Sequence, residues 1–176
     1  MIYEDEYREE TVIEIAKRMA LAAKTAPKGR GRNTIETIIV TGSDIEKIAK
    51  QMDKIAIEKS QGFFARDASN LRNSEAVLFI GTSIDPLGLE YCGYCGLPNC
   101  ETKDLQKDIP CTFNTVDLGI AIGSAVSIAA DNRIDNRVIF SAGLAIKELN
   151  VFDKNIKIIF GIPLSARRKN IYFDRK

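Results

Sequence analysis

Hydrophobic positions along the chain recur at two different spacings, which predict helices and strands. Apolar residues at helical spacing run from Asp5 to Thr25, where Pro27 and Gly29 end the pattern. A capping-box pattern, Ser43 followed by Glu46, opens a second helix. Further helices are expected over residues 63–73 and 112–131 and between the last two strands, and β-branched runs predict strands over 35–41, 76–81, 137–141 and 156–162. This order predicts an α+β fold, a mixed α/β sheet with helices on its faces.

One stretch of the chain has no regular pattern. Residues 82–111 contain all four cysteines and three of the five prolines. The total length, 176 residues, is that of one domain. We therefore interpret residues 1–176 as a single domain, with residues 82–111 as a cysteine-rich insertion within it.

The helix predicted over 112–131 is apolar or small on every side beyond Asp117, so we expect it to be buried all round. A single small sheet cannot cover such a helix, which predicts a homodimer with this helix at its centre. Gly119 and Gly123 allow a neighbouring helix to approach closely. The longest apolar run, 118–130, is too short to cross a bilayer, so we expect no membrane partner.

Composition excludes several kinds of site. The sequence has no histidine, which excludes Ser-His-Asp and Cys-His catalysis, haem ligation by histidine and HExxH zinc sites. The 25 basic residues nearly balance 24 acidic ones, so nothing indicates a nucleic-acid partner. The first ten residues carry five acids and one arginine, unlike a secretory signal, so we expect a cytoplasmic protein.

The cysteines form the sharpest motif in the sequence. They lie in Cys92-Gly-Tyr-Cys95-Gly-Leu-Pro-Asn-Cys100 and, after ten intervening residues, at Cys111. In a reducing compartment they are better interpreted as ligands or reactive thiols than as disulfides. Four thiolates on one loop can converge on a single metal centre, and the two glycines leave room for backbone amides to face the sulfur atoms. Zinc also accepts four thiolates, but zinc ribbons usually place them in two CxxC pairs. The pattern favours an iron–sulfur cluster, with zinc or metal-free thiol chemistry as alternatives.

This motif resembles the four-cysteine [4Fe-4S] motif of corrinoid iron–sulfur proteins and of the B subunits of Rnf-type electron-transport complexes. The resemblance implies that Cys92, Cys95, Cys100 and Cys111 are the cluster ligands. The spacing to Cys111 is shorter here than in those families.

Three other stretches occur in a recognisable order. They are Ala22-Ala-Lys-Thr-Ala-Pro27, the apolar helix 117–130, and Gly161-Ile-Pro163 after an apolar strand. Together they resemble the FMN-dependent nitroreductases, which have an A-P-S turn beside the flavin, a central dimer helix and a G-Y-P before basic residues. Lys28 stands where many nitroreductases have Ser, Arg30 or Arg32 where they have Asn, and the N-terminal arm is short. The whole sequence also resembles the uncharacterised proteins described as containing a ferredoxin domain.

Basic residues gather in two places. The loop Lys28-Gly-Arg30-Gly-Arg32 can seat a phosphate with its guanidiniums and glycine amides, or it is simply a solvated loop. The tail 167–175 mixes cations with Tyr172 and Phe173, which favours docking against a partner subunit or cofactor. The nitroreductase resemblance implies that both lie near a flavin. If FMN binds, the expected phosphate contacts are therefore Lys28, Arg30, Arg32, Lys169 and Arg175.

Together with the cysteine motif, the two resemblances imply a cytoplasmic redox protein, an FMN- and iron–sulfur-dependent oxidoreductase that passes electrons between a four-cysteine cluster and flavin. Such an enzyme would be nitroreductase- or NADH-oxidase-like and would act with a redox partner or a small-molecule substrate. The alternative is a non-enzymatic ferredoxin-like electron carrier, or a structural metalloprotein, without flavin. The stretch Phe63–Asp67 borders a substrate pocket or, as we favour, forms a core edge with a surface ion pair. No carboxylate pair stands out as a general acid and base.

Overall fold

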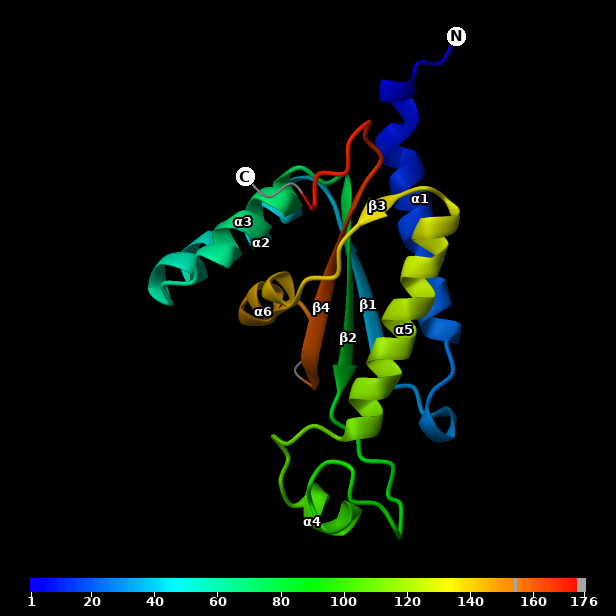
Figure 1. The fold of residues 1–176 in the computed structure, drawn as a ribbon, viewed down its shortest axis with the longest axis vertical. Helices are drawn as coiled ribbons and strands as arrows, with labels where there is room; N and C mark the ends of the chain where they lie inside the picture. Colours follow the sequence, from blue (N-terminus) through cyan, green and yellow to red (C-terminus); the bar gives the residue numbers. More distant parts are fainter. Residues whose placement is uncertain (154, 174–176) are drawn as a thin grey trace.

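The computed structural model describes residues 1–153 and 155–173 and is built around a four-stranded sheet (Figure 1). The strands lie in the order β1 (Ile35–Val40), β2 (Ala76–Ser83), β4 (Ile156–Ser165) and β3 (Asp135–Asn136). Each neighbouring pair is antiparallel. The α+β class is confirmed, and the described sheet is antiparallel from one edge to the other.

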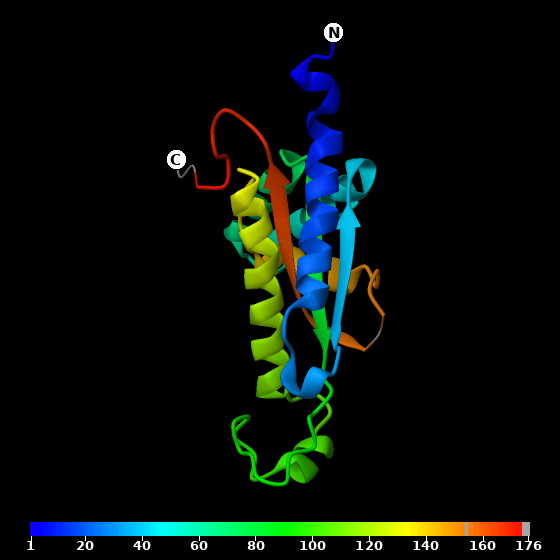
Figure 2. The same ribbon diagram turned by 90° about the vertical axis from the view of Figure 1, so that its right-hand side faces the viewer.

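Helices cover both faces of this sheet (Figures 1 and 2). They are α1 (Glu4–Thr25), α2 (Gly42–Glu58), α3 (Gly62–Arg72), α4 (Cys100–Asp104), α5 (Thr112–Asp131) and α6 (Phe140–Glu148), with a short 3-10 turn, η1 (Gly29–Gly31). One hydrophobic cluster joins α1 and α5 to the sheet, and a second joins α2, α3 and α6 to its other face.

The buried strand β2 shows why the sheet lies between two cores. Its alternate residues Val77 and Phe79 belong to the cluster under α2, α3 and α6. Leu78 and Ile80 belong to the cluster under α1 and α5. Side chains along a strand point to opposite faces in turn, so a strand covered on both faces is apolar at every position. The continuous run AVLFI in the sequence has this pattern.

Helix α5 is covered on only part of its surface within the single chain. Its inner residues, such as Leu118 and Ala121, are buried in the core. On its outer face, however, Val116 is 49% and Ile120 41% exposed. The helix is therefore not buried all round within one chain. By length and composition alone this 20-residue helix is long and apolar enough to cross a membrane, a test that a buried core helix also passes. The apolar run 118–130, which is shorter than the helix, did not indicate a segment of membrane-spanning length.

Two local predictions were wrong. The strand expected over 137–141 is replaced by the short β3, a single bridge from Ile139 to Gly161, and the start of α6 at Phe140. Gly143 lets this helix lie against β4, because a Cβ there would lie 1.8 Å from the Ile159 carbonyl oxygen. Only glycine lets α6 approach the sheet this closely. The capping box also fails, since α2 begins at Gly42 without a side-chain cap.

The two ends of the sheet carry different parts of the chain. Strand β2 leads at one end into residues 84–111, here called the cysteine segment, which projects beyond the sheet with α4 inside it (Figures 1 and 2). The start of α1 and the tail after β4 lie at the opposite end. The molecule is therefore elongated, with the cysteines at one tip.

Candidate functional site

The four predicted ligands all lie in the cysteine segment as free thiols. Cys111 is buried, and Cys92, Cys95 and Cys100 are partly exposed. A tight turn separates the first two, because the Gly96 amide donates to the Gly93 carbonyl at 2.9 Å. Within the described residues, no three cysteine or acidic side chains already form a group that could hold a metal ion. Shared ligation by the four cysteines therefore stays a prediction.

Local structure fixes the two later cysteines at helix starts. The Asn99 side chain caps α4 by accepting the Thr102 amide at 2.8 Å, which places Cys100 in the first turn. Cys111 is the residue before α5, and its carbonyl accepts the Thr115 amide at 3.2 Å. The first amides of a helix lack partners within it and form its positive end. A negatively charged sulfur is favoured at the start of a 20-residue helix such as α5.

Two buried polar side chains on the same two helices have hydrogen-bond donors left over. Lys103 lies three residues after Cys100 and is 1% exposed. Its ammonium donates to the Gln106 carbonyl at 3.1 Å and forms no ion pair within the described part of the chain. Asn114 lies three residues after Cys111 and is also 1% exposed. Its Oδ1 accepts the Asp85 amide at 2.8 Å, but its Nδ2 is buried without a partner.

These hydrogen-bond donors without an acceptor show which kind of group fits the cysteine segment. A buried ammonium normally needs a nearby anion, and a buried amide donor normally needs an acceptor. A four-thiolate iron–sulfur cluster offers both, because its sulfur atoms accept hydrogen bonds and its total charge is negative. Residues three apart on a helix share a face, so Lys103 neighbours Cys100 and Asn114 neighbours Cys111. The residues present therefore fit such a cluster.

Two surface hollows reach the cysteines. One, about 470 Å³ in volume, is lined by Cys92 with Tyr91, Tyr94 and Phe113. The Tyr94 and Phe113 rings are stacked with their centroids 5.9 Å apart. The other, about 490 Å³, is lined by Cys100 and four carboxylates, which are Asp85, Glu90, Glu101 and Asp104. The two hollows differ sharply in character, one aromatic and one acidic.

The basic loop lies beside the cysteine segment and holds it in place. Residues 28–32 are here called the basic clamp. Arg30 donates to the Leu87 carbonyl at 3.1 Å. Arg32 donates to the Pro86 carbonyl at 2.9 Å and forms an ion pair with Asp85 at 2.8 Å. These contacts join two parts of the chain more than fifty residues apart and fix the start of the cysteine segment.

The other donors of the basic clamp are committed to the protein itself. The Gly29 amide donates to both oxygens of the buried Asp117 carboxylate at 3.0 Å, and the Gly31 amide donates to the Lys28 carbonyl. Lys28 caps the end of α1, with bonds of 2.7–3.1 Å to three carbonyls. Burial, and then the nearby Lys24 ammonium, lower the pKa of Lys28, which Asp117 partly opposes. Only the guanidiniums, with five N–H donors each, keep some free for a phosphate.

The second basic stretch lies at the opposite end of the sheet. The basic clamp precedes Ile35, which pairs with Thr82 near the cysteine segment, whereas the tail follows Ser165. Between these ends runs the ten-residue strand β4, about 34 Å long at the usual rise per residue. One phosphate therefore cannot contact both basic stretches of the same chain. Lys169 is exposed at the tail end, and Arg175 lies outside the described residues.

The described part of the tail docks against its own chain. Tyr172 is buried, its hydroxyl is 2.9 Å from the Ser74 hydroxyl, and its carbonyl accepts from Arg137 at 2.9 Å. Burial is the main cause that raises the pKa of Tyr172. The Arg137 guanidinium also lies over the Phe173 ring, 5.3 Å from its centroid.

Beside this tail the structure shows a hollow that borders the stretch Phe63–Asp67. It has a volume of about 240 Å³ and is lined by Phe63, Phe140, Arg66 and Arg137. The Phe63 and Phe140 rings lie 5.6 Å apart. The expected ion pair of Arg66 with Asp67 is present at 2.9 Å, although Asp67 is buried and also accepts from Ser141. The only sequence signal was the stretch Phe63–Asp67, for which a substrate pocket was the less favoured interpretation.

Comparisons with known proteins identify related sequences. A family model described as "uncharacterized protein containing a ferredoxin domain (DUF2148)" matches residues 107–175. An uncharacterized protein of Archaeoglobus fulgidus is 39% identical over 182 residues, which cover 99% of this chain and 97% of that protein.

Solved structures establish the fold. A BluB-like flavoprotein from Clostridium difficile superposes with a TM-score of 0.58 at 17% identity, covering 93% of this chain and 84% of that one. A putative nitroreductase in complex with FMN from Desulfovibrio desulfuricans gives a TM-score of 0.56 at 11% identity, covering 93% of this chain and 78% of that one. The fold is therefore nitroreductase-like, as the order of the sequence motifs predicted.

Proposed function

Because the chain belongs to the family of uncharacterized proteins that contain a ferredoxin domain (DUF2148), we propose that it is a redox protein that binds a four-cysteine iron–sulfur cluster. The ligands are Cys92, Cys95, Cys100 and Cys111. The observation that best supports this is the pair of buried, unspent donors on Lys103 and Asn114, each one helical turn from a cysteine. When bound, a cluster supplies one-electron transfer.

In this proposal the chain's own residues shape the centre. The basic clamp fixes residues 85–87, and α5 presents Cys111 at its positive end. Lys103 contributes a positive charge and Asn114 an amide donor to the side of the centre that faces the protein. The aromatic hollow beside Cys92 and the acidic hollow beside Cys100 give a redox partner two ways of approach.

The test is anaerobic purification followed by iron, sulfide and zinc analysis and an absorption spectrum. The wild type should contain about four iron and four sulfide per chain. Cys100→Ala and Cys111→Ala should each lose most of both. Tyr94→Phe, in the same segment, is the matched control and should retain them. A content of one zinc per chain without sulfide would contradict the cluster and would indicate a structural zinc site instead.

We further propose that FMN binds at the hollow beside the tail. Phe63 and Phe140 offer aromatic faces there, and Arg66 and Arg137 offer guanidiniums. Two proteins of this fold are described as a flavoprotein and as an FMN complex, which favours a flavin here. The exposed Lys169 lies on the adjoining tail, and Arg175 is expected to add a further cation to the phosphate. FMN supplies the exchange between one- and two-electron transfer.

A homodimer would bring the basic clamp to this site. The clamp and the tail lie at opposite ends of one chain, so they can share a phosphate only when two chains pack in opposite directions. The outer face of α5 supports this arrangement, because a Cβ added at Gly119 or Gly123 would meet no atom within 4 Å. Ile120→Lys should then give a monomer in light scattering. The control is Ile57→Lys, which changes an 80%-exposed residue on α2 and should leave the dimer intact.

Titration of flavin-free protein with FMN tests this second proposal. Replacing Arg30 and Arg32 together by Ala should weaken FMN binding by a few kcal/mol, since hydrogen bonds to charged groups contribute roughly 1.5–3 kcal/mol each. Arg66→Gln should weaken it as well. If the affinity for FMN is unchanged in the double variant, the basic clamp does not contact the flavin. A wild type that binds no FMN would favour the flavin-free carrier, an alternative supported by the glycine amides already spent within the clamp.

A further inference from the structure

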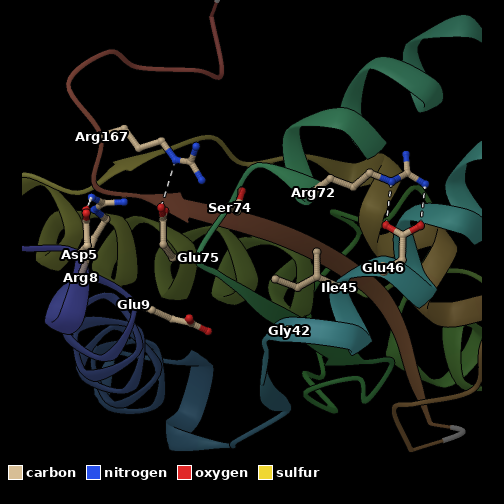
Figure 3. Close-up of a pocket in the computed structure, with 10 residues that line it drawn as sticks. All are labelled: Asp5, Arg8, Glu9, Gly42, Ile45, Glu46, Arg72, Ser74, Glu75 and Arg167. Atoms are coloured by element: carbon tan, nitrogen blue, oxygen red, sulfur yellow. Dashed lines mark hydrogen bonds and ion pairs between the residues drawn. The ribbon is translucent and has the colours of Figure 1, made fainter.

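A charged cavity lies at the end of the molecule opposite the cysteine segment (Figure 3). Its volume is about 420 Å³. The first turns of α1, the start of α2, the connection from α3 to β2, and Arg167 after β4 form its walls. None of the residues placed so far in the redox sites lines it, so its chemistry needs a separate explanation.

Negative charge exceeds positive charge around this cavity. Three arginines line it, and each forms an ion pair with an acid. Arg8 pairs with Glu4 and Asp5, Arg72 with Glu46 and Asp53, and Arg167 with Glu75. Glu9 also lines the cavity and has no hydrogen bond or ion pair within the described residues. Four of these carboxylates, those of Asp5, Glu9, Glu46 and Glu75, line the cavity together with the three guanidiniums, and this excess of negative charge attracts a cation.

A second, independent observation is the state of Glu75. Its side chain is only 8% exposed. One carboxylate oxygen accepts from Arg167 Nε at 3.1 Å, and the other, Oε2, is buried with no hydrogen-bond partner. A buried carboxylate oxygen without a donor is costly, so a donor from outside the protein is expected beside it. Figure 3 shows the Glu75 carboxylate between Arg167 and the side of the cavity where Glu9 lies.

We propose that this cavity binds a compact organic cation that carries N–H donors, such as a primary ammonium. One N–H would satisfy Glu75 Oε2 and a second would reach Glu9, while Ile45 gives an aliphatic chain an apolar wall. A metal ion fits less well, because within the described residues no three acidic side chains form a group that could hold one. The cavity is also large enough for a short diamine.

Calorimetric titration of the purified full-length protein with putrescine tests the proposal. We expect saturable binding, and weaker or no binding of tetramethylammonium, which has the charge but no N–H. Glu75→Gln should weaken putrescine binding by about tenfold or more, because it replaces the unpaired acceptor and removes a charge. Arg167→Gln should strengthen it, because it frees the second Glu75 oxygen. Glu58→Gln, which changes an exposed carboxylate at the end of α2 remote from the cavity, is the matched control.

The outcomes separate clearly. If Glu75→Gln unfolds, the exposed Glu9→Gln provides the same test and should weaken binding severalfold. Equal binding of putrescine and tetramethylammonium would overturn the role of Glu75 Oε2. No saturable binding to the wild type at millimolar putrescine would overturn the proposal and leave water as the occupant. None of these results depends on the metal or flavin content of the protein.

Discussion

Lys103→Met separates the two explanations for the buried lysine in α4. If Lys103 only supports the fold, its removal should destabilise the protein whether or not metal is bound. If it is held buried to balance an anionic cluster, its removal should have opposite effects on the two forms. Methionine has a similar length and no charge, so the substitution changes the electrostatics more than the packing.

In the metal-free protein the expected effect is stabilisation. The Lys103 side chain is almost completely buried and forms one hydrogen bond, to the Gln106 carbonyl. Keeping an ammonium out of water costs several kcal/mol, whereas that hydrogen bond contributes about 1 kcal/mol. We expect the variant to be about 1–3 kcal/mol more stable, a rise of about 2–10 °C in Tm for a chain of this size. Thermal unfolding of chelator-treated protein measures it.

In the cluster-loaded protein the expected effect is a lower midpoint potential. A positive charge next to the centre favours the added electron, so its removal makes reduction harder. A shift of roughly 59 mV corresponds to a tenfold change in a one-electron equilibrium and is readily measured by a redox titration followed by EPR. Cluster retention during dialysis should fall in parallel.

Lys107→Met is the matched control, because Lys107 lies in the same segment but is exposed and paired with Asp104 at 2.6 Å. Exposed ion pairs contribute only about 0–1 kcal/mol, so neither form should change much. Equal destabilisation of both forms by Lys103→Met, with an unchanged potential, would refute the reasoning and make Lys103 a structural residue.

Three further predictions concern the fold and its supports. Gly143→Ala should lower the free energy of unfolding, measured by urea denaturation, by about 3 kcal/mol or more, because the new Cβ meets the Ile159 carbonyl oxygen. A smaller loss would show that α6 can move away from the sheet. Asp117→Ala should lower the free energy of unfolding by about 1.5–3 kcal/mol, because it removes the acceptor of the Gly29 amide. The variant should also be cleaved more easily in the cysteine segment during limited proteolysis. Burial raises the pKa of Tyr172, so above about pH 10 the folded state keeps a proton that the unfolded state loses, and the free energy of unfolding should fall as pH rises. Tyr172→Phe should lack this decline. If the decline persists in the variant, it belongs to other groups.

The sequence predicted those helices and strands whose structure follows from the local pattern of apolar residues. The first helix, the helix 112–131 and the three longer strands are long apolar segments with clear ends, and the structure has them within three residues of the predicted bounds. The strand expected over 137–141 failed because α6 begins at Phe140, and Gly143 lets that helix pack closely on β4. That contact spans two distant parts of the chain, and local patterns do not contain it.

The candidate site could be predicted only in part for the same reason. The cysteine spacing is local, and it identified the segment. The partners of Arg30 and Arg32 lie more than fifty residues away, so the sequence could not show that these side chains clamp residues 85–87. Lys103 stands among polar and acidic residues in ETKDLQKD, which is typical of an exposed helix. Its only signal was its position three residues after Cys100, which matters once both are known to lie on α4.

The placement of the two proposed redox sites makes the oligomeric state part of the mechanism. The cysteine segment lies beyond one end of the sheet, and the hollow beside the tail lies next to the middle of β4, where Ile139 bridges Gly161. Electron transfer between a cluster and a flavin on the same chain would have to cross about half the length of this strand. In a dimer whose chains run in opposite directions along α5, the cysteine segment of one copy lies at the tail end of its partner. The open outer face of α5, the committed amides of the basic clamp and the opposite ends of the two basic stretches all favour transfer between chains rather than within one.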